Sequence, residues 1–136
     1  MPQISSELNS QYWEPVATGP VAQADISAWS GVGGPPATIA AGANFTSPTI
    51  IADGFKLIAA AVTSTQAGAI SVQRYIDRAG TIAQGAAVST AITGGTPAVV
   101  NVGSDNLPFQ SFVLKITNTG ASTATISGFA LLLNAD

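Results

Sequence analysis

The clearest alternation of hydrophobic and polar positions lies near the C-terminus, in residues 108–134. Phe112, Leu114 and Ile116 occupy every second position, a spacing that predicts a β-strand with one buried face. Residues 118–120 follow, and Asn118 and Gly120 are residue types that tolerate the positive φ angles of tight hairpin turns. Residues 123–133 are again β-branched or apolar. The pattern predicts a two-stranded hairpin in an all-β core.

Short strands separated by turn residues begin at residue 37 and recur at intervals of about 8 to 12 residues, as in sandwiches and barrels. Before the hairpin, the predicted strands are residues 37–41, 45–51, 55–64, 69–76, 81–84, 86–92 and 97–102. Hairpin connections between them would make the sheets antiparallel. The sequence therefore predicts an antiparallel two-sheet sandwich of about eight strands, with jelly-roll or Greek-key topology.

Two of these strands carry more specific predictions. Pro48 predicts that its strand lies at a sheet edge or is interrupted, because proline has no N–H group to donate. In residues 69–76, the two-residue period places Arg74 on the same face as Ile70 and Val72. Arg74 and Tyr75 are also candidates for an interface, but we expect ordinary surface positions for both.

Residues 1–36 differ from the rest and predict an extended N-terminal arm, followed by a β-sandwich domain at residues 37–136. Five of the eight prolines and both tryptophans lie in the arm. Tyr12, Trp13 and Trp29 are costly to expose, and such rings commonly anchor interfaces, so we predict that they bind a neighbouring protein. The alternative, that the arm folds back and buries these rings on its own sandwich, fits the sequence equally well.

The composition describes the surface of this sandwich. Only 8% of the residues are charged, compared with about 25% in an ordinary soluble domain. Such a surface has little long-range repulsion and suits a protein that packs against neighbours. With four basic residues and a net charge of −3 we expect no nucleic-acid binding, and the apolar runs are too short for a membrane span of about 20 residues. Residues 1–15 lack a secretory signal, which indicates synthesis in a cytoplasm.

The residue types present limit the candidate chemistry. Histidine and cysteine are absent from the sequence, which removes the usual general base, the thiol nucleophile and the main zinc and copper ligands. The loop aspartates fit turn positions, because Asp bonds the backbone two residues on. A carboxylate pair for glycoside hydrolysis and a calcium site near residues 104–106 are minor alternatives. We expect no enzyme activity and no cofactor.

Two stretches carry a family resemblance: QAGAISVQRYID at residues 66–77, and FVLKITNTG at residues 112–120 with the aliphatic strand after it. Over residues 37–134 the chain resembles the β-sandwich decoration, or cement, proteins of tailed-bacteriophage capsids. The resemblance implies a virion protein, made in the host cytoplasm, that binds the major capsid protein on the outer capsid surface and stabilises capsomer joints. It also implies a homo-oligomer, with a trimer favoured.

A second function fits the same fold. A receptor- or glycan-binding module of a tail or fibre would also use a compact β-sandwich. Such a module requires exposed aromatic residues on the sandwich to stack on sugar rings, and Tyr75 is the obvious candidate.

Overall fold

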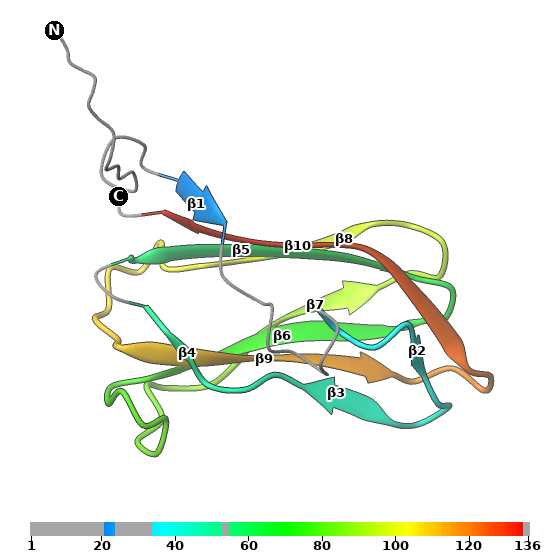
Figure 1. Ribbon diagram of the computed structural model, residues 1–136, viewed down its shortest axis with the longest axis horizontal. Helices are drawn as coiled ribbons and strands as arrows, with labels where there is room; N and C mark the ends of the chain where they lie inside the picture. Colours follow the sequence, from blue (N-terminus) through cyan, green and yellow to red (C-terminus); the bar gives the residue numbers. More distant parts are fainter. Residues whose placement is uncertain (1–20, 24–33, 53–54, 135–136) are drawn as a thin grey trace, which may run out of the picture.

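The computed structural model describes residues 21–23, 34–52 and 55–134 (Figure 1). These residues form two antiparallel β-sheets packed face to face, with no helix among them, which confirms the predicted all-β sandwich. The strands are β1 (Val21–Gln23), β2 (Thr38–Ile39), β3 (Asn44–Thr46), β4 (Ile50–Ile51), β5 (Leu57–Ser64), β6 (Gly68–Tyr75), β7 (Val88–Ile92), β8 (Ala98–Val102), β9 (Ser111–Asn118) and β10 (Ala124–Asn134). The first sheet has the order β1-β10-β5-β8, with β2 also paired to β10. The second has the order β3-β9-β6-β7, with β4 also paired to β9.

The chain makes these sheets as one long hairpin wrapped around the core. β6 pairs with β7, β5 with β8, β3 and β4 with β9, and β2 with β10, so that each pair encloses the one before it. The pairs β6–β9 and β5–β10 then join the nested strands into two sheets. This nested order is the one found in jelly rolls, the first of the two topologies that the sequence left open.

The predicted C-terminal hairpin is wrong. Both strands exist, but β9 and β10 belong to different sheets, and residues 119–123 cross from one sheet to the other. Among the successive strands from β4 to β10, only β6 and β7 are paired neighbours. Most paired strands are therefore antiparallel because the connecting segments cross from one sheet to the other, and not because hairpins join them. The predicted strand at residues 81–84 is reduced to a single bridge between Tyr75 and Ala83.

Asn118 reverses the chain by a different means from the one predicted. Neither Asn118 nor Gly120 has a positive φ angle, and Asn118 is the buried last residue of β9. Its side-chain N–H groups donate to the carbonyl oxygens of Ile39 (3.0 Å), Ala40 (3.2 Å) and Ser122 (2.9 Å). Its Oδ1 accepts from the Gly120 N–H at 2.9 Å. The amide thereby ties the end of β9 to β2 and to the crossing segment.

The core lies between the inward faces of the two sheets. Its fully buried apolar side chains include Ile58, Val62, Ile70, Val72, Val100, Phe112, Leu114, Ile116 and Leu131. Of the five phenylalanines expected there, Phe112 is fully buried, and Phe45, Phe55, Phe109 and Phe129 are partly buried against the core. The Phe109 and Phe112 rings meet edge to face, with centroids 6.5 Å apart.

The prediction made from Pro48 is confirmed. Pro48 lies between β3 and β4, which share the edge position beside β9. At this interruption Ser47 maintains the pairing with Leu114. The Ser47 N–H donates to the Leu114 carbonyl (2.8 Å), and the Leu114 N–H donates to the Ser47 hydroxyl oxygen (2.9 Å).

β10 contains an irregularity that was not predicted. Its register against β5 shifts between Ser127 and Ala130, where Gly128 has a φ angle of 58°. A bulge of this kind changes which positions face inward. Ile126 before it and Phe129 after it therefore both pack against the core, although they are three residues apart.

Candidate interaction surface

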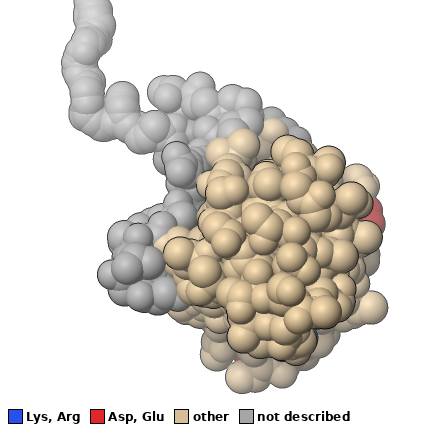
Figure 2. Space-filling view, turned by 90° about the vertical axis from the view of Figure 1, so that its right-hand side faces the viewer, with Lys and Arg blue, Asp and Glu red and all other residues tan. Residues whose placement is uncertain are grey.

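The charged side chains of the described residues gather at one end of the sandwich. Residues 76–87 and 103–110 form most of this end, which we call the loop end, and only Lys115, on β9, lies away from it. The charged residues at the loop end are Lys56, Arg74, Asp77, Arg78 and Asp105. Residues 40–43, 65–67, 93–97 and 119–123 form the opposite end and include no charged residue. Figure 2 faces that end and shows no Lys or Arg on it.

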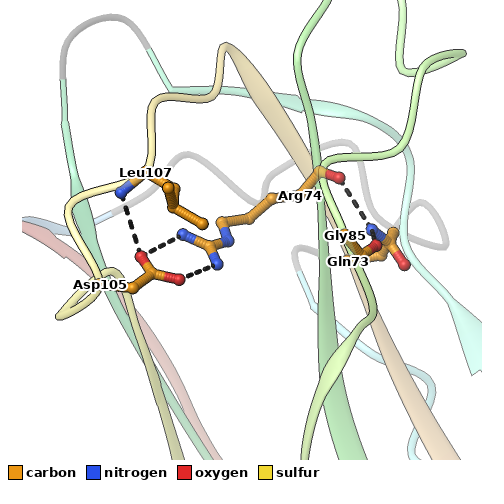
Figure 3. A network of polar contacts seen from close by, with 5 residues as sticks. All are labelled: Gln73, Arg74, Gly85, Asp105 and Leu107. Atoms are coloured by element: carbon orange, nitrogen blue, oxygen red, sulfur yellow. Dashed lines mark hydrogen bonds and ion pairs between the residues drawn. The ribbon is translucent and has the colours of Figure 1, made fainter.

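An ion pair between a buried arginine and a solvent-exposed aspartate holds the loop end together (Figure 3). Arg74 points inward from β6, is only 5% exposed, and donates from Nη1 and Nη2 to the two carboxylate oxygens of Asp105 at 2.9 and 2.6 Å. Its guanidinium also lies over the Phe109 ring, 5.6 Å from the centroid. The position of Arg74 on the face shared with Ile70 and Val72 is confirmed, and the expected surface position is wrong. The pair clamps residues 103–110 onto β6.

Asp105 also shapes its own loop. Its Oδ1 accepts from the Leu107 N–H at 3.2 Å, the bond to the backbone two residues on that was predicted for a turn aspartate. Asn106, between them, has a φ of 59°, a conformation that Asn tolerates. The hydrogen bond from Arg74, assisted by the Leu107 N–H, lowers the pKa of Asp105 to about 2. The carboxylate is therefore ionised at neutral pH and remains paired.

Asp77 braces the neighbouring loop in a similar way. Its carboxylate accepts from the backbone N–H groups of Thr81 and Ile82, both at 2.9 Å, and from the Thr81 hydroxyl. These contacts, first of all the Thr81 hydroxyl, lower the pKa of Asp77. The Ser111 hydroxyl donates to the Asp77 carbonyl oxygen at 2.6 Å and so ties the loop to β9.

The far side of this loop is attached to β6. The Gln73 side chain donates to the carbonyl oxygens of Arg74 (2.8 Å) and Gly85 (3.0 Å), as Figure 3 shows. The Gln84 N–H donates to the Arg74 carbonyl at 2.8 Å. The loop is thus hydrogen-bonded to the sandwich on both of its sides.

These braced loops hold large apolar side chains in solvent. Ile76, Ile82 and Leu107 are 52%, 57% and 48% exposed, and the Ile76 N–H donates to the Ile82 carbonyl. Pro108 and half-buried Phe109 line two hollows of about 380 and 220 Å³, the first shared with Leu107 and the second with Ile76. We call these five residues the loop-end surface. Exposed apolar side chains on a fixed backbone are typical of interaction sites.

The two aspartates of the loop end brace their own loops. Asp77 and Asp105 both have lowered pKa values and hold their own loops, so neither is suited to act as a general acid near neutral pH. Among the described residues no group of three or more His, Cys, Asp or Glu side chains could hold a metal ion. The described part of the chain contains no helix long and apolar enough to cross a membrane.

The predicted anchors Tyr12, Trp13 and Trp29 lie outside the described residues, so their role stays a prediction. Tyr75 is half-buried at the end of β6. The loop-end surface was not predicted from the sequence. The signal that points to it is an apolar residue beside a turn aspartate, Ile76 before Asp77 and Leu107 shortly after Asp105.

No family model matches the chain, and the search of curated proteins found no match.

Proposed function

We propose that this chain is a non-catalytic structural protein of a virion, which binds the major capsid protein on the outer surface of a phage capsid and stabilises the joints between capsomers. The observation that supports this proposal is the loop-end surface. Ile76, Ile82, Leu107 and Phe109 present apolar area on loops fixed by two aspartates and a buried arginine. Docking such loops requires little further ordering, so less of the binding free energy is lost.

A protein at a capsomer joint acts by burying surface on both sides of it. A specific interface buries about 1,600 Å² in total. When several copies are linked in an oligomer, the oligomer binds more tightly than one copy, although each copy makes the same contacts. The chain is therefore proposed to act as a homo-oligomer, as the resemblance implies. A centrally placed, half-buried ring such as Phe109 is a typical energetic hot spot.

The arm fits this proposal as a second point of attachment. Strand β1 pairs antiparallel with the end of β10, with Val21 opposite Asn134. Residues 1–20, which include Tyr12 and Trp13, precede this paired strand, and a fully extended chain of that length spans about 66–72 Å. Trp29 lies between β1 and β2 in the sequence. We propose that these three aromatic residues anchor the arm on a neighbouring protein.

Capsid shells that lack the protein test the proposal. The purified chain should co-sediment with such shells and raise their melting temperature. Leu107→Asp and Ile82→Asp should each weaken co-sedimentation by at least about tenfold, because a carboxylate would be buried in an apolar contact. Thr93→Asp, at the exposed opposite end, is the matched control and should bind normally.

Three results would count against parts of this proposal. Failure of the unmodified chain to bind or stabilise shells contradicts capsid binding. Normal binding by both loop-end variants contradicts the loop end as the docking surface. Full shell occupancy by residues 21–136, which retain β1, contradicts a role for Tyr12 and Trp13.

A glycan-binding module of a tail or fibre is the second candidate, and Phe109 favours it. Phe109 lines both hollows, which are also lined by Asn106, Gln84 and Gln110. Sugars are held by this combination of an aromatic face and amide groups. Glycan-array binding that is lost in Phe109→Ala, together with no binding to shells, would favour this function.

A further inference from the structure

The outer face of the first sheet is unusual in having no charge. Within β5, β8 and β10, all of them described, no residue is charged. Leu57, Ala59 and Ala61 alternate with the inward core residues of β5 and therefore point outward. Antiparallel sheets with a solvated face normally carry polar residues on it. The polar residues of this face, such as Thr63 and Asn101, are uncharged, and its apolar residues lie next to one another across the three strands.

A hollow lies near one end of this face, and the register explains it. Ala59, on the central strand β5, has Leu132 of β10 on one side and Asn101 of β8 on the other. Its single methyl group lies between two longer side chains, which leaves a depression. The hollow has a volume of about 360 Å³, and Leu57 and Asn134 also line it.

The same face carries protruding apolar side chains. Leu132 and Val99 are 39% and 47% exposed. In the next outward row of the sheet, Ala130 and Ala61 lie beside Val99, so the β10 position changes from a long side chain to a short one while the β5 position stays an alanine. A protrusion and a depression of similar chemistry thus lie side by side on one face, as a self-complementary contact requires.

We propose that this face is where two copies of the chain meet, as a two-fold symmetric pair in which Leu132 of each copy enters the hollow over Ala59 of the other. A face without charge does not repel its own copy, and sheets pack face to face at about 10 Å. The contact is isologous and gives a dimer, which departs from the trimer that the resemblance implies. It stands independently of capsid binding.

The mass of the full-length chain in solution tests the pairing. Light scattering or sedimentation equilibrium over a roughly hundredfold concentration range should show the 13.5 kDa monomer converting to a species of twice that mass. Ala59→Lys should weaken the dimer by at least about tenfold, because it places a charge in the hollow. Ala69→Lys is the matched control, since Ala69 is equally half-buried and points outward from a central strand of the other sheet. It should dimerise normally.

Circular dichroism and melting curves establish that the variants fold. If Ala59→Lys does not fold, Leu132→Gln, at an exposed position, serves in its place and should weaken the dimer. A wild-type chain that stays monomeric or forms a trimer overturns the proposal. So does a folded Ala59→Lys or Leu132→Gln that dimerises like the wild type. A dimer that fails to bind shells supports the pairing and contradicts the proposed function. A monomer that binds shells contradicts the pairing and supports the proposed function.

Discussion

Replacing Asn118 with alanine tests how the uncharged end of the sandwich is held together. The Asn118 side chain is 2% exposed and makes four hydrogen bonds. Three run from its N–H groups to carbonyl oxygens of β2 and of the segments beside it, and the fourth runs from the Gly120 N–H to Oδ1. Alanine removes all four and leaves the backbone path unchanged.

The size of the effect follows from which partners can reach water. A hydrogen bond contributes about 0.5–1.5 kcal/mol net, and a buried group left without a partner costs about 1–3 kcal/mol. The bond to the Ile39 carbonyl is buried, so that oxygen loses a donor that water cannot replace, whereas the other three bonds are partly buried and their groups are closer to solvent. We therefore expect Asn118→Ala to lower the free energy of unfolding by about 2–4 kcal/mol, and the Tm by roughly 10 °C.

Urea unfolding followed by circular dichroism measures this change. Asn44→Ala is the control, because Asn44 is an exposed strand asparagine and its loss should change stability by less than about 0.5 kcal/mol. Asn118→Gly separates two explanations. A turn residue chosen for positive φ would tolerate glycine, whereas a strand residue that acts through its amide would not. A loss below about 1 kcal/mol in Asn118→Ala, or a glycine variant more stable than the alanine variant, would refute the amide explanation.

Two further predictions concern residues 103–110 of the loop end. Gly103 has a φ of 114°, and a Cβ at this position would meet the Lys56 carbonyl oxygen. Gly103→Ala should therefore lower the urea midpoint more than the control Gly42→Ala, because Gly42 has a φ of 74° but open space around it. Equal midpoints for the two variants would contradict this prediction. Arg74 lowers the pKa of Asp105 from 3.8 to about 2. The ion pair therefore stabilises the folded state above pH 3.8, and this stabilisation is lost as the pH falls from 3.8 toward about 2. The urea midpoint of the wild type should therefore fall more steeply over this range than that of Asp105→Asn, and parallel curves would show that the pair has no effect.

The sequence predicted the strands of this protein better than their partners. The alternation of Phe112, Leu114 and Ile116 correctly identified a strand and its buried face. It could not reveal that β9 and β10 lie in different sheets, because both sheets turn apolar faces toward the same core. Local turn chemistry was misleading for a similar reason. Asn118 fits a hairpin turn by type, but two of its partners, Ile39 in β2 and Ala40 just after it, are 79 and 78 residues away.

The candidate site was harder to predict than the fold. The two-residue period correctly placed Arg74 on the inward face, but a lone charge in a core is unfavourable, which argued for the surface. Its partner Asp105 is 31 residues away and reaches Arg74 only because the chain crosses between the sheets. The pair could not be inferred before the topology was known. The same holds for the loop-end surface, which that pair supports.

The two proposed surfaces can act together because no residue of the loop-end surface lines the hollow over Ala59, although Ser104 at the loop end does. The loop-end surface lies beyond the ends of the strands, whereas the uncharged face runs along β5, β8 and β10 (Figure 1). A pair formed through the sheet faces would leave both loop ends accessible, and two linked loop ends would bind a shell with avidity. Ala59→Lys should then weaken shell binding although Ala59 is not part of the docking surface, while Leu107→Asp should weaken it without changing the mass of the dimer. Ala59→Lys protein that is monomeric yet binds shells as tightly as the wild type would show that pairing plays no part in attachment.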